Sequence, residues 1–305
     1  MNRILLFIFL TGGMNSLRAQ TITDGDMMPK NNLCTGFMYG FDRWHEYWEG
    51  SLKRDNLNVG SVTTQSLSWV GVFGINRNLN AIVMVPYVWT RASMGVLHGM
   101  NGVQDLSVSA KYRIADIPAG GGRIRVHGVL TFSTPMSRYT PDFLPLSIGL
   151  ACKDLSWRLG ANYSMAKGFF FNASGAYTWR SNITLDRTSY FSDGQFFLTD
   201  VVWMPNVFDY ILSAGYHKHG LSGELNFWNQ NTLGGGDIRR QDMPFASNRM
   251  NFSKAGALFI YDVPKPKGFN IHAGVNYTLA GRNVGQSVSV MAGLLYTVQF
   301  THEEN

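Results

Sequence analysis

The sequence predicts an all-β fold: a 12-stranded antiparallel transmembrane β-barrel with short periplasmic turns and long extracellular loops. The first observation is the stretch Gln286–Phe300, in which apolar and polar residues alternate with a period of two. Such alternation gives a strand one apolar and one polar face. The stretch is also about as long as a tilted strand that crosses a bilayer with some overhang. A strand of a soluble β-sandwich would alternate too, so the prediction also depends on the rest of the chain.

Composition is the second observation. Charged residues make up 15% of the chain and aromatic residues 13%, and the mean hydropathy is −0.08. Soluble proteins usually contain about a quarter charged residues, and helical membrane proteins are far more apolar. A membrane β-barrel lies between the two classes, because only every second residue of its strands faces lipid. No internal stretch approaches the length of an apolar spanning helix, so a membrane location requires strands.

Three segments are expected along the chain. Residues 1–19 are predicted to be a secretory signal peptide, because the apolar run Ile4–Leu10 follows Arg3 and precedes a small, polar stretch that ends at Ala19. Residues 20–32 are expected to form a periplasmic N-terminal leader, and residues 33–305 the outer-membrane β-barrel of a Gram-negative-type cell. Removal of the signal peptide, which carries two arginines and no acidic residue, lowers the formal net charge from +6 to +4.

Alternating runs recur after the leader, and the third observation is how they are connected. There are twelve, an even number, as a closed bacterial barrel requires. Short and long connections alternate along the chain. If both termini are periplasmic, every short connection lies on the periplasmic side and every long one on the extracellular side. Residues 196–205 are left open as a further strand or a loop that plugs the lumen. The twelve predicted strands are Leu33–Arg43, Val59–Ile75, Leu79–Met94, Gly102–Ile114, Gly122–Ser133, Leu146–Met165, Gly168–Ile183, Phe208–Lys218, Leu221–Asn231, Asn251–Asp262, Gly268–Ala280 and Gly285–Phe300.

Polar and charged residues occupy the strand positions that alternate with the apolar ones, so we expect them to face the lumen. A charge that faced lipid at the midplane would cost about 2–4 kcal/mol for Arg or Lys. One interpretation is a cation-rich constriction that favours anionic or dipolar solutes. The other is a set of interior salt bridges that fill a closed barrel. The candidate lumen-lining residues are Asp105, Lys111, Arg113, Arg125, His127, Arg158, Arg180 and Glu224.

Two short motifs carry a family resemblance. Gly102-Val103-Gln104-Asp105 leads into a strand that ends Lys111-Tyr112-Arg113, and a turn at Asn76–Asn78 leads into Val85-Pro86-Tyr87. These features, with the twelve-strand layout, resemble the outer-membrane transporter family named for the meta-pathway of phenol degradation. The chain departs from the family pattern at Gln104, where a second glycine is usual. The resemblance implies an outer-membrane channel or transporter, often assigned to small hydrophobic or aromatic compounds.

Motifs of other functional classes are missing from the sequence. It contains no G-x-S-x-G, HExxH, CxxC or phosphate-binding loop, so we expect no enzyme activity, no catalytic residues, no metal site and no cofactor. The net charge is mild and no basic run suits nucleic acid. Cys34 and Cys152 are expected as two small apolar strand residues, with a disulfide as the alternative. A barrel hydrolase and a structural or surface-binding barrel with a plugged lumen remain alternative functions.

The end of the last strand resembles the C-terminal signal of bacterial outer-membrane proteins. Tyr296, Val298 and Phe300 complete its apolar face, and an aromatic residue ends it. The expected partners are therefore outer-membrane lipid, the barrel-assembly machinery and a small-molecule solute. The sequence leaves the oligomeric state open.

Overall fold

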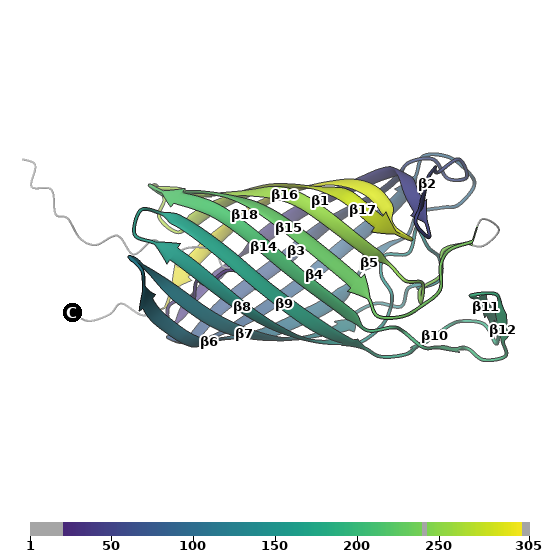
Figure 1. The fold of residues 1–305 in the computed structure, drawn as a ribbon, viewed down its shortest axis with the longest axis horizontal. Coiled ribbons are helices and arrows are strands. Elements are labelled where there is room, and N and C mark those ends of the chain that lie inside the picture. Colours follow the sequence, from purple (N-terminus) through teal and green to yellow (C-terminus); the bar gives the residue numbers. More distant parts are fainter. Residues whose placement is uncertain (1–20, 240–242, 301–305) are drawn as a thin grey trace, which may run out of the picture.

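The computed structural model describes residues 21–239 and 243–300, and it forms one closed antiparallel barrel (Figure 1). This architecture confirms the predicted fold class. No helix that could span a membrane occurs in the described part of the chain. The barrel strands are β1 (Asn32–Glu49), β3 (Val62–Asn76), β4 (Leu79–Ala92), β6 (Asp105–Ala119), β7 (Gly122–Pro135), β8 (Asp154–Met165), β9 (Phe169–Arg180), β14 (Val207–Lys218), β15 (Leu221–Thr232), β16 (Asn251–Asp262), β17 (Phe269–Arg282) and β18 (Gly285–Gln299).

Each barrel strand pairs with the next one along the chain, and the last pairs with the first. The closing ladder between β1 and β18 runs from Asn32 opposite Gln299 to Trp44 opposite Ser287. Closure removes the free edges that an open sheet would expose, which lipid cannot hydrogen-bond. The remaining strands, all short, lie outside this path or at its margin: β2 (Leu52–Asp55), β5 (Asn101–Val103), β10 (Ile183–Thr184), β11 (Tyr190–Ser192), β12 (Gln195–Phe197) and β13 (Val201–Val202).

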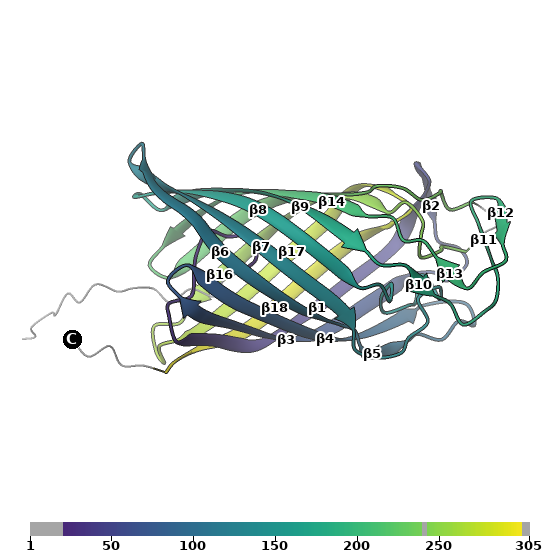
Figure 2. The same cartoon turned by 90° about the horizontal axis from the view of Figure 1, so that it is seen from below.

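Short and long connections sort to opposite ends of the barrel, here called the turn end and the loop end (Figure 2). At the turn end, His219 and Gly220 both have positive φ (51° and 79°), as a two-residue hairpin turn requires. At the loop end, connections of more than ten residues join the strands, except at residues 283–284. The short connections are therefore the periplasmic turns and the long ones the extracellular loops that the sequence predicts.

At the loop end one predicted strand needs correction, and the run at 196–205, which the sequence left open, belongs to a loop. The run Leu146–Met165 is not one strand, because β8 begins only at Asp154. Leu146 instead belongs to a loop and lies fully buried against Val59 and against Val62 at the start of β3. The run at 196–205 holds parts of the short strands β12 and β13, which pair within the loop and add no strand to the barrel. Burial explains the apolar start of the first run. In the second run Val202 and Met204 are buried in a loop cluster, whereas Phe196, Leu198 and Trp203 are exposed.

The alternation of side chains places apolar groups outside and polar groups inside. On β8, Leu155, Trp157 and Leu159 are exposed on the outer surface, whereas Arg158 and Asn162 are buried inside. This arrangement inverts a soluble barrel and matches a lipid environment outside. A second apolar cluster packs the loops against each other above the loop end; it contains Cys152, Ile183, Leu185, Tyr190, Val202, Met204, Phe245 and Ala246.

Candidate functional site: a lumen occupied by the leader

The leader enters the barrel at the turn end and occupies the lumen there. Met28 is fully buried, and its side chain packs against the inward-facing Cys34, Val72, Ile82 and Leu295. The Asn31 N–H donates a hydrogen bond to the Gly74 carbonyl of β3 (2.8 Å). Apolar packing and a backbone hydrogen bond thus hold the leader to the wall. The predicted signal peptide boundary lies outside the described residues.

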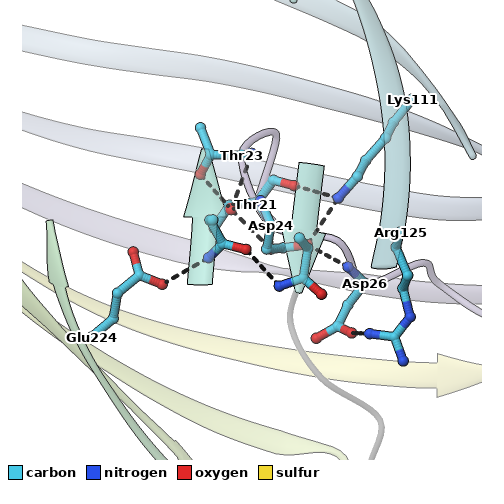
Figure 3. A network of polar contacts seen from close by, with 9 residues as sticks. Thr21, Thr23, Asp24, Asp26, Lys111, Arg125 and Glu224 are labelled. Atoms are coloured by element: carbon cyan, nitrogen blue, oxygen red, sulfur yellow. Dashed lines mark hydrogen bonds and ion pairs between the residues drawn. The ribbon is translucent and has the colours of Figure 1, made fainter. Parts of the chain in front are cut away.

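Lys111 of β6 binds the leader at Thr21 and Asp24 (Figure 3). The Lys111 side chain is fully buried, and its Nζ donates to the Asp24 carboxylate and to the Thr21 carbonyl, both at 2.8 Å. The carboxylate also accepts from the Thr21 hydroxyl (2.8 Å) and the Asp26 N–H (2.9 Å). Burial raises the pKa of Asp24, but the Lys111 charge and the hydrogen bonds from Lys111 and Thr21 outweigh it and lower the pKa below its usual value. Asp24 therefore pairs with Lys111 as an ionised carboxylate at neutral pH.

Arg125 of β7 forms the second ionic contact with the leader. Its Nη1 lies 3.2 Å from the Asp26 carboxylate, and its Nε lies 3.9 Å from Asp116 of β6. Asp116 also pairs with Arg113 (3.9 Å) and Arg123 (2.8 Å). The three arginines at the turn end thus share two carboxylates, one from the wall and one from the leader.

The leader also contacts β8, the strand next to β7. A Cβ on Gly25 would approach the Asn162 Cβ to 2.5 Å, so only glycine fits at this contact unless the leader shifts. Asn162 donates to Asn172 (2.6 Å), and Asn172 donates to Glu224 (3.4 Å), which forms a polar chain across β8, β9 and β15. A cavity of about 100 Å³ remains between the leader and these strands. The leader therefore fills most of the lumen at this level.

Two predicted lumen residues form part of the wall without contacting the leader's carboxylates. Arg158 pairs with Asp209 of β14 (2.6 Å) and donates to Ser174 (3.1 Å). His127 is buried on β7, and a Cβ on Gly160, its neighbour in register, would lie 2.5 Å from the His127 ring. Gly160 thus provides the space that the imidazole occupies.

The last two predicted residues lie toward the loop end. Asp105 accepts a hydrogen bond from Tyr139 (2.7 Å), a residue of the loop between β7 and β8. Arg180 ends β9 opposite Asp154 in register. The eight predicted residues therefore divide into those close to the leader (Lys111, Arg113, Arg125, His127, Glu224), a wall residue paired within the wall (Arg158) and residues at the loop end (Asp105, Arg180).

Sequence reasoning missed Asp24, Asp26 and Met28. The available signal was charge complementarity: a leader with two nearby carboxylates precedes a barrel whose inward positions carry Lys111 and Arg125. The leader has no strand periodicity, so alternation could not place it.

Comparison with known proteins identifies the family. The sequence model of the family described as "Putative MetA-pathway of phenol degradation" matches residues 57–294. The chain belongs to this family. No curated protein sequence matches it.

A solved structure shares the barrel fold at low sequence identity. An outer membrane channel from Pseudomonas putida F1 aligns with a TM-score of 0.71 and 12% identity, over 90% of this chain and 98% of that chain. The NanC porin aligns with a TM-score of 0.46 and 10% identity, over 86% of this chain and 98% of that chain. The chain belongs to this family, shares the fold of an outer membrane channel and has an apolar outer surface. It is therefore an outer-membrane barrel.

Proposed function

We propose that this protein is a passive outer-membrane channel for a small solute, and that the leader closes it at the turn end. The carrying observation is that the leader is a separate segment held by a few contacts, chiefly Asp24 to Lys111, Asp26 to Arg125 and the buried Met28. Displacement of the leader would leave an interior lined by polar residues, as water and solute passage requires. The family and the fold shared with an outer membrane channel support this function.

The proposed solute is small and hydrophobic, aromatic or anionic. Once the leader leaves, Lys111 and Arg125 lose a carboxylate each and present net positive charge to the lumen, which would favour anions. The same proposal includes a secretory signal peptide at residues 1–19, a Gram-negative-type cell and assembly by the barrel-assembly machinery. It assigns no enzymatic activity to the chain.

A structural barrel without transport is the second candidate. The observation that favours it is the packing of the loops at the other end, where Leu146 is fully buried among Val59 and Val62. A lumen closed at both ends would serve as a scaffold for the extracellular loops.

Conductance in planar bilayers separates the two candidates. Refolded full-length protein is compared with a variant that lacks residues 21–27, which retains Met28 and the Asn31 contact to β3. We expect rare, small openings from the full-length protein and sustained openings from the truncated one. A truncated barrel that folds, as judged by a heat-dependent gel shift, but never conducts would overturn the channel assignment and favour the structural barrel.

A further inference from the structure

A second cavity lies inside the barrel, on the loop side of the leader. Its volume is about 320 Å³, and five strands (β1, β3, β16, β17 and β18) contribute to its wall. Asp42 lies ten residues above the start of β1, which places it roughly 33 Å along the strand from the turn end. We call this cavity the vestibule; it is lined by Asp42, Trp44, Thr64, Phe252, Lys254, Thr278, Val284, Gly285 and Ser287.

The vestibule contains one anion and one cation that lack an ionic partner within the described residues. Asp42 accepts a hydrogen bond from the Ser289 hydroxyl, and the Lys254 Nζ donates to the Ser287 hydroxyl (3.4 Å). Lys111, Arg125 and Arg158, by contrast, each have a carboxylate within 3.2 Å. Burying a charge without an opposite charge is costly. Asp42 and Lys254 are thus available to bind a charged solute.

The spacing of the two charges is set by β18. Ser287 and Ser289, which hold Lys254 and Asp42, are two residues apart and face the same way. Two residues of a strand span about 7 Å. The Asp42 carboxylate and the Lys254 ammonium are each held at a different serine and form no ion pair within 4 Å, although the charge of Asp42 reaches Lys254 at longer range. A solute whose own two charges lie close together can therefore bind between them.

Aromatic rings flank the charges. The Lys254 ammonium lies over the Phe252 ring, 4.9 Å from its centroid. Phe252 also packs edge-on against Trp228. Trp44 lies against the strand start at Gly285, where any Cβ would collide with the indole. The rings therefore offer an apolar surface beside the charged pair, and Gly285 is needed to seat the indole.

We propose that the vestibule binds a small dipolar solute that carries both a carboxylate and an ammonium group on an apolar or aromatic body. The carboxylate pairs with Lys254, the ammonium with Asp42, and the body packs on Trp44 and Phe252. A solute with a single charge would leave one of the two protein charges unpaired and desolvated. The inference deepens the proposed channel function and rests on it for the solute's passage, although binding can be measured alone.

Three probes of equal shape test the vestibule by titration calorimetry on refolded full-length protein: phenylalanine, 3-phenylpropionate and 2-phenylethylamine. Phenylalanine is expected to bind at least tenfold more tightly than either singly charged probe. Lys254→Met is expected to remove the advantage over 2-phenylethylamine, and Asp42→Asn the advantage over 3-phenylpropionate. Lys167→Met, at an exposed turn, serves as the control and is expected to change nothing.

The outcomes separate this inference from the channel assignment. Equal binding of the three probes, no binding, or binding that neither vestibule variant alters would each overturn the dipolar site. If the truncated barrel conducts but phenylalanine does not bind, the vestibule inference fails and the channel stands. If phenylalanine binds as expected but the truncated barrel does not conduct, the site stands and the channel fails.

Discussion

At the scale of single residues, the buried cations of the lumen differ in which segment supplies the partner carboxylate. Lys111 is paired with a carboxylate of the leader, whereas Arg158 is paired with Asp209 on a neighbouring part of the wall. In the proposed open channel the leader moves away and takes Asp24 into water, so loss of that pair need not strain the barrel. The Arg158 pair has no such escape, because both side chains belong to barrel strands.

The pair of Arg158 with Asp209 in the barrel wall predicts that Asp209→Asn destabilises the barrel. The substitution leaves the Arg158 guanidinium buried without a charge partner, and we expect a loss of about 3 kcal/mol in the free energy of unfolding. Urea titration in detergent, read by the heat-dependent gel shift, measures this loss. Asp193→Asn, at a loop carboxylate with 66% of its side chain exposed, is the control and should change stability little. Equal stability of both variants would show that the Arg158 pair contributes nothing to the fold.

Alternation along single strands predicted which residues face inward, because a strand fixes side-chain direction by a period of two. Lys111 and Arg158 are buried inside the barrel, as their positions in the alternating runs indicate. Alternation could not predict which acid pairs with each cation, because pairing depends on neighbours that are distant in sequence. Asp209 is 51 residues from Arg158, and Asp24 is 87 residues from Lys111.

At the scale of elements, the closing strand β18 and the leader meet at the turn end. The Phe300 N–H donates to the Asn31 carbonyl (3.1 Å), so the residue after β18 joins the leader just before β1 begins. Tyr296 faces outward and packs on Phe269, with 4.7 Å between ring centroids. Val298 pairs with Leu33 across the closing seam. The proposed assembly signal thus lies at the seam that closes the barrel.

Removal of the last aromatic side chain is expected to impair assembly more than stability. Phe300 is 63% exposed, so Phe300→Ala removes few contacts in the folded barrel, and its backbone hydrogen bond is retained. We expect less protein in the outer-membrane fraction at unchanged synthesis, but an unchanged unfolding midpoint for the protein that is assembled. Immunoblots of membrane fractions and urea titration measure the two quantities. A normal amount of the variant protein in the outer-membrane fraction would show that Phe300 has no role in assembly.

The ends of the strands could be predicted from the sequence where a tight turn joins them. They could not be predicted where a long loop packs against other parts of the protein. Gly220 marks a hairpin turn, and the strands on either side of it, β14 and β15, begin and end close to their predicted positions. The run that begins at Leu146 was assigned to a strand because it is apolar, but its apolar start belongs to a loop and is buried against Val59 and Val62. Apolar burial in a loop cluster and in a strand look alike in a sequence.

At the scale of the whole molecule, the structure is a barrel whose lumen is divided by its own leader. The turn-end half holds the paired charges of Asp24 with Lys111 and Asp26 with Arg125, and the loop-end half holds the vestibule with Asp42 and Lys254. The overall architecture followed from periodicity, composition and connection lengths, which are properties that one sequence displays. The position of the leader did not, because it depends on complementarity between a segment without regular structure and a lumen that exists only after folding.

The most direct test of the account is a reversible crosslink between the leader and the wall. Gly25→Cys with Asn162→Cys, in a background with Cys34→Ala and Cys152→Ala, places two thiols where the leader contacts β8, and a small shift of the leader gives them disulfide spacing. Each single-cysteine variant is the control. We predict that the oxidised double variant does not open at all in a planar bilayer and that reduction in the same membrane restores the openings of full-length protein, while the controls respond to neither treatment. Equal conductance of the crosslinked and reduced forms would contradict the claim that the leader closes the channel.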